Sequence, residues 1–338
     1  MSSPGPSSPP RADPRALAWG VTMPALRWDG SAYRPHDPTA PPERCVREGV
    51  AGFILFGGEG DAAARLIDSL RAGARRPLLF GADLERGVGQ QFAGSTSLPP
   101  AGALGALDDL TVTRAAGEIT GREAGALGID LLFAPVADLA GEPDNPIVGP
   151  RAFAADAAHA ARHVAAWIEG ARGADALPCV KHFPGHGRAA GDTHLGAVTL
   201  RGCRRELEAD LEPFRAAIAA GVPLVMPGHL AAPALDPTGA IATVSPRLLG
   251  ELLRGRLGFE GVIVSDALLM GGAGELTTTA VEAIRAGVDL LLYPAEADAA
   301  VEAVAAAARA DAAFHDRLAE AWRRVRACAE RRVATRAS

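Results

Sequence analysis

Lysine occurs once in this chain, at position 181. The sequence contains 34 lysine and arginine residues, so arginine occupies every other basic position. This usage indicates that position 181 needs a compact ammonium group and not a planar guanidinium. Lys181 begins the segment Lys-His-Phe-Pro-Gly-His-Gly, directly after residues 177–180, whose apolar character is typical of a short buried strand. We therefore interpret Lys181 as a ligand for a polar substrate; the alternative is a surface lysine retained by chance.

Asp266 is the second candidate, because it ends the run Gly-Val-Ile-Val-Ser-Asp. A strand of small and β-branched residues would present this carboxylate at the edge of a sheet. A carboxylate in that position can attack an anomeric carbon and form a covalent glycosyl-enzyme intermediate. The alternative is that Asp266 only caps the following helix.

Residues 181–194 carry three histidines and one acid, namely His182, His186, His194 and Asp192. Three imidazoles and a carboxylate can hold zinc, but a long glycine- and alanine-containing loop separates the first histidine from the last. We therefore expect no metal and no other cofactor. The triplet Asp-Thr-His favours a dyad in which Asp192 orients His194, and His194 protonates a leaving oxygen and later deprotonates water. A solvent-exposed loop histidine is the alternative for His194.

Apolar, strand-like runs alternate with alanine-rich amphipathic stretches along the chain. The runs lie at residues 16–23, 52–56, 77–82, 129–134, 177–180, 223–226, 261–265 and 288–293. The amphipathic stretches lie at residues 61–74, 110–126, 155–172, 204–220, 246–257 and 278–286. This alternation predicts an α/β fold, a single (β/α)8 TIM barrel over residues 16–338 with C-terminal helices. Residues 1–15, rich in serine and proline, are expected to form a disordered tail.

The carboxyl ends of barrel strands lie at one mouth, and polar residues follow five of the predicted strands. We expect one site built from these strand-end residues: Asp83, Asp138, Arg151, Lys181, His182, His229 and Asp266.

Composition narrows the possible partners. The net charge of −6 and the pI near 5.8 argue against nucleic acid and against an anionic membrane surface. We interpret the arginine-rich residues 323–336 as a solvated terminal helix with cations near its end. The motifs G-x-G-x-x-G and G-x-x-x-x-G-K, which mark many nucleotide sites, do not occur. A small-molecule substrate is expected, and the oligomeric state stays open with a monomer slightly favoured.

Cysteine usage and the N-terminus indicate the compartment. The four cysteines are far apart and lack C-x-x-C spacing, which is typical of a reduced, cytoplasmic protein. The N-terminal residues lack the apolar stretch of a signal peptide, and no apolar run is long enough to cross a bilayer.

Four segments together resemble glycoside hydrolase family 3, and within it the bacterial β-N-acetylhexosaminidases of the NagZ type. They are residues 181–187, the triplet at 192–194, Asn145-Pro-Ile-Val-Gly-Pro-Arg151 and residues 261–270. The resemblance spans roughly residues 16–293. It implies that Asp266 is the nucleophile, that His194 and Asp192 form the acid/base dyad, and that the −1 subsite uses Lys181, His182, Arg151 and Asp83.

The sequence departs from the family pattern in one segment. The family usually reads Asp-x-Glu-Gly-Gly-Arg-Val-x-Arg, whereas this chain reads Asp83-Leu-Glu-Arg-Gly-Val-Gly-Gln-Gln-Phe. Asp83 and Glu85 are kept, and both usual arginines are absent. Arg86, two residues early, is the candidate to bind the same carboxylate or sugar oxygen, while Gln91 brings no charge.

By this resemblance the chain is a retaining exo-β-N-acetylglucosaminidase that hydrolyses β-linked N-acetylglucosamine from small peptidoglycan-derived sugars. A β-glycoside phosphorylase or β-glucosidase on the same barrel is an alternative, because a neutral imidazole acid/base repels phosphate less than a carboxylate does. A non-catalytic sugar-binding barrel is a third reading, based on the altered residues 83–92. The presence of Asp266, Asp192 and His194 favours an enzyme.

Overall fold

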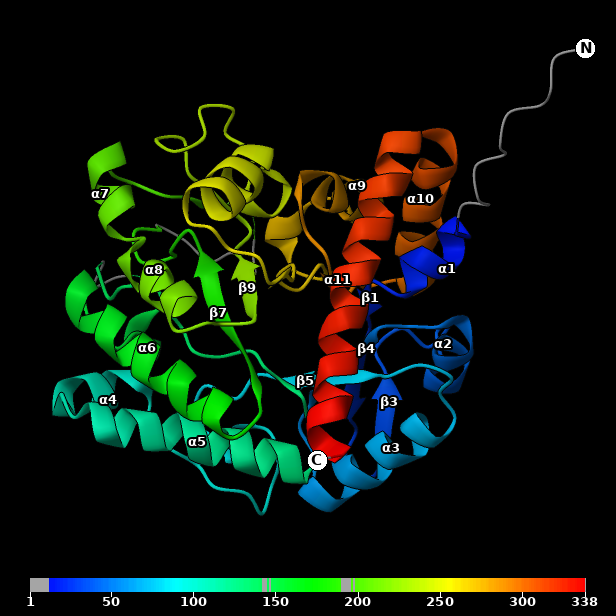
Figure 1. Ribbon diagram of the computed structural model, residues 1–338, viewed down its shortest axis with the longest axis horizontal. Helices are drawn as coiled ribbons and strands as arrows, with labels where there is room; N and C mark the ends of the chain where they lie inside the picture. Colours follow the sequence, from blue (N-terminus) through cyan, green and yellow to red (C-terminus); the bar gives the residue numbers. More distant parts are fainter. Residues whose placement is uncertain (1–11, 142–144, 146, 190–195, 197, 338) are drawn as a thin grey trace, which may run out of the picture.

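The computed structural model describes residues 12–141, 145, 147–189, 196 and 198–337. Helices surround a central sheet (Figure 1). The strands are β1 (Thr22–Met23), β2 (Ala25–Trp28), β3 (Tyr33–Pro35), β4 (Gly52–Phe56), β5 (Leu79–Ala82), β6 (Leu131–Leu132), β7 (Leu177–Phe183), β8 (Val198–Thr199), β9 (Leu224–Pro227), β10 (Leu230–Ala231), β11 (Val262–Ile263) and β12 (Leu291–Leu292).

The α-helices are α1 (Pro14–Trp19), α2 (Pro42–Glu48), α3 (Gly60–Ala72), α4 (Ala101–Leu107), α5 (Leu110–Ala126), α6 (Ala157–Gly173), α7 (Arg204–Ala209), α8 (Glu212–Ala219), α9 (Leu276–Ala286), α10 (Ala297–Ala310) and α11 (Ala312–Ala337). Short 3-10 turns are η1 (Val88–Gln90), η2 (Gly149–Arg151), η3 (Ala242–Val244) and η5 (Gly271–Ala273), and η4 (Arg247–Arg256) is π-helical.

The central sheet is almost entirely parallel. Its strand order is β11-β9-β7-β6-β5-β4-β2-β3, and only the outermost strand β3 runs antiparallel to its neighbour. Figure 1 shows β7 and β9 side by side, pointing the same way. Since helices connect most of these parallel strands, the α/β class predicted from the alternating pattern is confirmed.

Backbone hydrogen bonds continue past the last strand of this sheet. The amide of Ser265, just after β11, donates to the carbonyl of Leu290 at 2.9 Å. In turn the amides of Leu291 and Tyr293 donate to Val21 at 2.8 Å and to Met23 at 2.9 Å. The ladder therefore runs from β11 through β12 to β1, which leads into β2.

The first predicted strand is wrong in its first half. Residues 14–19 form helix α1, in which Asp13 is the N-cap and accepts hydrogen bonds from the amides of Arg15 and Ala16. Proline at the first helical position reinforces this start. The predicted disordered tail, residues 1–15, therefore ends too late, because Pro14 and Arg15 are helical; residues 1–11 lie outside the described part.

The predicted helix 204–220 is two helices, α7 and α8. Pro213 at the start of α8 cannot donate a backbone hydrogen bond to the preceding turn, so the helix restarts there. The other predicted helices are present within a few residues, α10 and α11 are the predicted C-terminal helices, and α2 and α4 are additional.

The strands divide the core into two apolar clusters. In β4, Phe53 and Leu55 belong to the larger cluster, which includes helix residues, whereas Ile54 belongs to a second cluster built mainly from strand residues. This alternation is the two-residue period of a strand. Cys179 lies in the second cluster, so the side chain of Lys181 leaves β7 on the same face.

Helix α11, the long red helix in Figure 1, is anchored by two buried carboxylates. Asp289, before β12, accepts from the Ile263 amide at 3.0 Å and pairs with Arg254 at 2.6 Å and with Arg317 of α11 at 2.8 Å. Asp130, before β6, pairs in the same way with Arg332 of α11 at 3.2 Å. The interpretation of residues 323–336 as a solvated terminal helix is wrong for Arg332, which is buried against the strands, whereas Arg323, Arg326 and Arg331 are exposed.

None of the helices in the described part of the chain combines the length and the apolar character that crossing a membrane requires.

Replacing Asp289 by asparagine tests this anchor. The variant leaves Arg254 and Arg317 without their buried counter-charge, and we expect a loss of about 3–5 kcal/mol in unfolding free energy. Urea denaturation followed by circular dichroism measures it. Glu330→Gln on the same helix removes only the exposed Arg326–Glu330 pair and should cost less than about 1 kcal/mol. Equal stability of the two variants would contradict an anchoring role for Asp289.

Candidate active site

A cavity of about 620 Å³ opens at the carboxyl ends of the parallel strands. Its described lining includes Asp83 after β5, Lys181 and His182 in β7, Asp266 after β11 and Tyr293 after β12. Arg86 and Arg151 also line it. Strand-end polar residues far apart in the sequence are thus brought together, as the strand pattern predicts.

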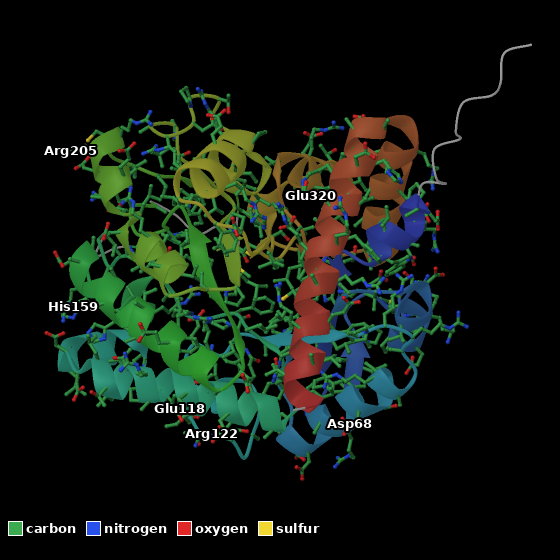
Figure 2. All side chains as sticks on the ribbon, viewed as in Figure 1. Asp68, Glu118, Arg122, His159, Arg205 and Glu320 are labelled. Atoms are coloured by element: carbon green, nitrogen blue, oxygen red, sulfur yellow. The ribbon has the colours of Figure 1, made fainter. Side chains whose placement is uncertain are left out.

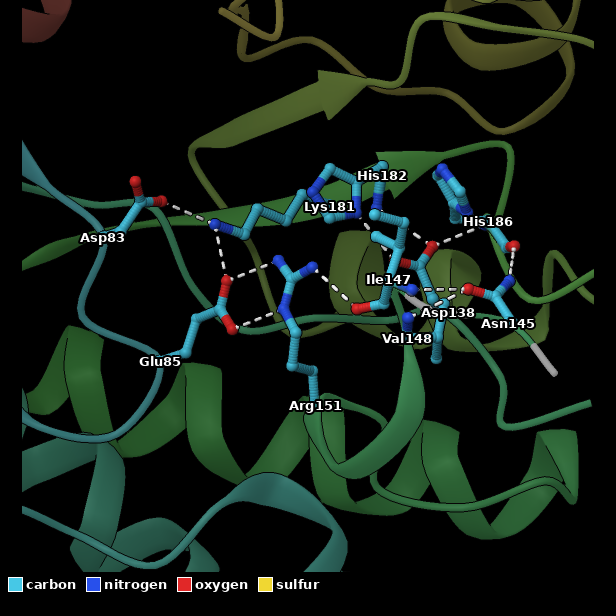
Figure 3. A network of polar contacts seen from close by, with 10 residues as sticks. All are labelled: Asp83, Glu85, Asp138, Asn145, Ile147, Val148, Arg151, Lys181, His182 and His186. Carbon is cyan, nitrogen blue, oxygen red and sulfur yellow. Dashed lines mark hydrogen bonds and ion pairs between the residues drawn. The ribbon is translucent and has the colours of Figure 1, made fainter. Parts of the chain in front are cut away.

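Lys181 lies at the centre of the polar network in this cavity (Figure 3). Its Nζ is 2.7 Å from Oδ1 of Asp83 and 2.8 Å from Oε1 of Glu85, and the side chain is 3% exposed. Burial acts to lower the pKa of Lys181, but the two carboxylates outweigh it and raise that pKa. The ammonium therefore stays charged and is held by two acids from one loop.

Glu85 joins Lys181 to Arg151. The Arg151 guanidinium binds both oxygens of Glu85, with Nε 2.8 Å from Oε2 and one terminal nitrogen 2.7 Å from Oε1. Despite the opposing effect of burial, Lys181 and Arg151 lower the pKa of Glu85. Glu85 is thus an ionised bridge between two cations, a role that the sequence alone did not assign.

Asn145 shapes the turn that brings Arg151 into place. Its side-chain oxygen accepts from the amides of Ile147 at 2.9 Å and Val148 at 3.0 Å, and its Nδ2 donates to the carbonyl of His186 at 2.9 Å. Arg151 completes the turn by donating to the Ile147 carbonyl at 3.0 Å. Asn145 and residues 147–151 therefore link the loops after β6 and β7 (Figure 3).

Asp138 orients His182. Its Oδ2 is 2.7 Å from Nδ1 of His182, and its Oδ1 accepts from the amides of His182 at 3.2 Å and His186 at 2.6 Å. Burial acts to raise the pKa of Asp138, but His182, His186 and these hydrogen bonds lower it to about 2. An ionised Asp138 holds Nδ1 of His182 as the donor, and among the described residues Nε2 has no partner, so it is available to a bound ligand.

The two carboxylate oxygens of Asp266 differ in their contacts with the described residues. Its Oδ1 accepts from the amide of Ala267 at 2.7 Å, and no described residue hydrogen-bonds to Oδ2. Burial opposes ionisation, but His182 and His229 outweigh it and lower the pKa of Asp266. The side chain is therefore a carboxylate with an available oxygen inside the cavity, the state that a nucleophile needs.

His229 lies behind Asp266 and is not among the described residues that line the cavity. It is fully buried, with Nδ1 2.8 Å from the Thr243 hydroxyl and Nε2 3.1 Å from the carbonyl of Ala267. The sequence prediction made His229 a substrate ligand; its position instead fits a positioning role, because it holds the residue that follows Asp266.

All residues of the altered segment after β5, residues 83–92, lie in the described part of the chain. Arg86 is exposed and lines the cavity, and its amide donates to the side-chain oxygen of Gln90 at 2.8 Å. Gln91 accepts from the amide of Gly57 at 3.0 Å. The pair formed by Glu85 and Arg151 therefore does not involve Arg86. Asp192 and His194, the predicted dyad, lie outside the described residues.

The rim carries residues that the sequence analysis did not select. Arg27 lies over the Phe56 ring, 5.0 Å from its centre, and donates to the Tyr293 hydroxyl at 3.2 Å. Phe56 and Tyr293 line the cavity and end two predicted strands. An aromatic residue where a strand ends is the signal that would have identified them.

Metal ligation inside the cavity has little support in the described residues. Only Asp108, His159 and His163, among those residues, bring three ligand atoms close enough for one ion, and all three lie outside the cavity.

Comparison with known proteins identifies the family of this chain. Residues 38–328 match the family model described as glycosyl hydrolase family 3 N terminal domain. A β-hexosaminidase of Stenotrophomonas maltophilia (strain K279a) is 36% identical over 273 residues, covering 76% of this chain and 80% of that protein. A protein of Cellulomonas fimi named β-N-acetylglucosaminidase/β-glucosidase is 35% identical over 289 residues, covering 82% of this chain and 51% of that protein.

Solved structures show the same relationship. The β-N-acetylhexosaminidase from Beutenbergia cavernae DSM 12333 has a TM-score of 0.82 and 30% identity, covering 94% of this chain and 98% of that one. The fold and the cavity thus define a carbohydrate-cleaving enzyme. The chain belongs to glycosyl hydrolase family 3 and is a glycoside hydrolase, which confirms the family inferred from the four motifs.

Substituting Lys181 tests whether the site needs a compact ammonium. Lys181→Arg keeps the charge but brings a larger, planar group between Asp83 and Glu85, and Lys181→Met removes the charge. We expect both to lower kcat/KM for an aryl glycoside by at least about 100-fold, which corresponds to about 2.7 kcal/mol. Circular dichroism and a melting curve check folding. Wild-type activity in a folded Lys181→Arg variant would show that any cation suffices.

Proposed function

We propose that this chain is a retaining exo-β-N-acetylglucosaminidase that releases β-linked N-acetylglucosamine from small peptidoglycan-derived sugars in the cytoplasm. The observation that carries the proposal is the carboxylate oxygen of Asp266 that accepts no hydrogen bond from a described residue, in the cavity that also holds the network around Lys181. The names of the relatives from Stenotrophomonas and Beutenbergia support an amino-hexose substrate, and the name of the Cellulomonas relative includes β-N-acetylglucosaminidase.

We propose that the strands close into one (β/α)8 barrel. The hydrogen bonds from Ser265 to Leu290 and from Leu291 to Val21 support closure, since they join β11, β12 and β1. The second apolar cluster draws residues from these strands and from β4, β6, β7 and β9, as a filled barrel interior would. In this arrangement the cavity lies at the carboxyl mouth, where barrel enzymes carry their active sites.

The network around Lys181 would bind the terminal sugar. Asp83 uses Oδ1 for Lys181, and no described residue occupies its Oδ2, which can accept from a hydroxyl. The Lys181 ammonium can bind a hydroxyl by a charge-assisted hydrogen bond, which is about twice as strong as a neutral one, and Nε2 of His182 can bind a neighbouring hydroxyl. Burial of this end of the cavity favours an exo enzyme that takes one terminal ring.

The proposed reaction is a double displacement. Oδ2 of Asp266 attacks the anomeric carbon while His194, oriented by Asp192, protonates the departing glycosidic oxygen. This gives a covalent glycosyl ester and a free alcohol. His194 then removes a proton from water, whose oxygen attacks the same carbon, and Asp266 leaves as a carboxylate. The two inversions retain the β configuration.

A panel of aryl glycosides tests the sugar, the acceptor and the nucleophile together. We expect the wild type to cleave the aryl N-acetyl-β-glucosaminide at least about 10-fold better than the aryl β-glucoside, at a rate that phosphate does not change. Asp266→Asn should lower kcat by at least about 10⁴-fold, because the amide cannot form the glycosyl ester. A rate that rises with phosphate and yields a sugar phosphate would favour a phosphorylase, and turnover in Asp266→Asn would refute the nucleophile.

Replacing His194 by alanine tests the acid of the dyad. We expect a fall in kcat/KM of about 10²–10⁴-fold for substrates with poor leaving groups and a much smaller fall for a dinitrophenyl leaving group, which needs no protonation. His315→Ala, at a histidine of α11 that does not line the cavity and contacts the Ala12 carbonyl, is the matched control. An equal loss for all leaving groups would argue that His194 is not the acid.

A further inference from the structure

A separate cluster of metal-ligand side chains lies where α4 ends and α6 begins. Asp108 is the C-cap residue of α4, and His159 and His163 are in the first two turns of α6. Residues four apart lie on one face of a helix, and the two imidazole rings stack with centres 5.0 Å apart. Figure 2 shows His159 on α6 at the edge of the molecule.

The distances between the possible ligand atoms of Asp108, His159 and His163 are close to those around a tetrahedrally coordinated ion. Oδ1 of Asp108 is 3.3 Å from Nε2 of His163 and 3.6 Å from Nε2 of His159, and all three ligand atoms lie within 4.8 Å of one another. An ion with bonds of about 2.0–2.1 Å in tetrahedral geometry places its ligands ~3.4 Å apart. The three side chains therefore need little movement to surround an ion.

A second interaction orients the buried histidine. Nδ1 of His163 is 2.8 Å from the hydroxyl of Thr113 on α5, so Nε2 faces Asp108. An outer partner on the second imidazole nitrogen is the usual support of a metal-binding histidine. His163 is fully buried, whereas Asp108 is exposed, which leaves one side of the cluster open to water.

We propose that Asp108, His159 and His163 bind one zinc-class divalent cation, with water as the fourth ligand. Two imidazoles and a carboxylate form a donor set that suits zinc and its neighbours, and not magnesium or calcium. His159 would release its 3.0 Å contact with the Gly105 carbonyl and present a bare Nε2. The proposal does not depend on the proposed function.

The ion would stabilise one wall of the cavity without taking part in the reaction. It joins the end of α4 to α6, and α4 contributes Ala101 and Leu104 to the cavity lining. Phe153, which also lines the cavity, stacks on His163 with ring centres 5.5 Å apart. A link between these elements restricts this wall, and binding to the folded state alone raises the melting temperature.

Arg162 competes with the ion and provides a matched control. Its guanidinium is 3.1 Å from Oδ1 of Asp108, the same oxygen that faces both histidines. Arg162→Gln removes this competing cation but none of the ligands. It should therefore bind zinc at least as tightly as the wild type does.

The test uses the full chain, freed of metal with EDTA and desalted. Zinc is titrated by calorimetry, cobalt(II) serves as the spectroscopic probe, and melting curves are recorded with and without zinc. We expect one equivalent bound, a visible spectrum typical of four-coordinate cobalt, and a melting temperature raised by several degrees at about 100-fold excess over Kd. His159→Ala and Asp108→Asn should each weaken binding by at least about 10-fold, while Arg162→Gln should not.

The binding results distinguish a zinc ion bound at Asp108, His159 and His163 from one bound elsewhere in the chain. Loss of zinc in His159→Ala, with unchanged circular dichroism and glycosidase activity, would support it. Unchanged affinity for one equivalent in both His159→Ala and Asp108→Asn would place the ion elsewhere in the chain and overturn the proposal. Absence of zinc and cobalt binding to the wild type would overturn it directly.

Discussion

The site depends on one buried charge that is fully compensated. The Lys181 ammonium is 3% exposed and touches Asp83 and Glu85 at 2.7 and 2.8 Å. A buried cation without partners would cost several kcal/mol, and one with two acids remains ionised. Glu85 extends this network of ion pairs to Arg151. Its bidentate contact with Arg151 connects the loop after β5 to the turn in which Asn145 lies.

This coupling explains how the chain tolerates its altered segment. In the family pattern that the sequence resembles, arginines follow the conserved acids, whereas here the two positions are occupied differently. Glu85 is nonetheless saturated by Lys181 and Arg151, both from other elements. The acids of this segment therefore keep their position and charge without the missing arginines, and Arg86 is left at the exposed rim.

The sequence predicted which residues form the site better than it predicted the hydrogen bonds and ion pairs between them. Apolar runs end just before Lys181 and Asp266, so local pattern alone placed both at strand ends. The partner of Lys181 lies 98 positions away, and that of His182 lies 44 positions away. Which strand-end acid meets which base depends on sheet order and loop path, so the bridging roles of Glu85 and Asp138 were not predictable.

Local sequence patterns also gave wrong predictions where a strand pattern and a helix N-cap overlapped, or where the partner of a side chain is distant in sequence. The apolar run at residues 16–23 predicted a strand, but Asp13 and Pro14 begin a helix there, because a cap fixes the first turn before the strand pattern applies. The burial of Arg317 and Arg332 in α11 was not predictable, because their acids, Asp289 and Asp130, are distant in sequence. His229 was placed correctly near Asp266 but is buried behind it.

The acids of the site differ in how many hydrogen bonds they accept, and this difference fits their roles. Both carboxylate oxygens of Asp138 and of Glu85 accept hydrogen bonds. These two carboxylates therefore hold His182, Lys181 and Arg151 in place. Asp266 accepts a single described hydrogen bond and is kept ionised by His182 and His229. Each hydrogen bond to a carboxylate oxygen withdraws the electron density that attack requires. A carboxylate that nearby imidazoles stabilise, and that has one oxygen without a hydrogen bond, can be ionised and still reactive. The neighbouring acids, Asp138 and Glu85, support this reactive carboxylate by fixing the side chains around it.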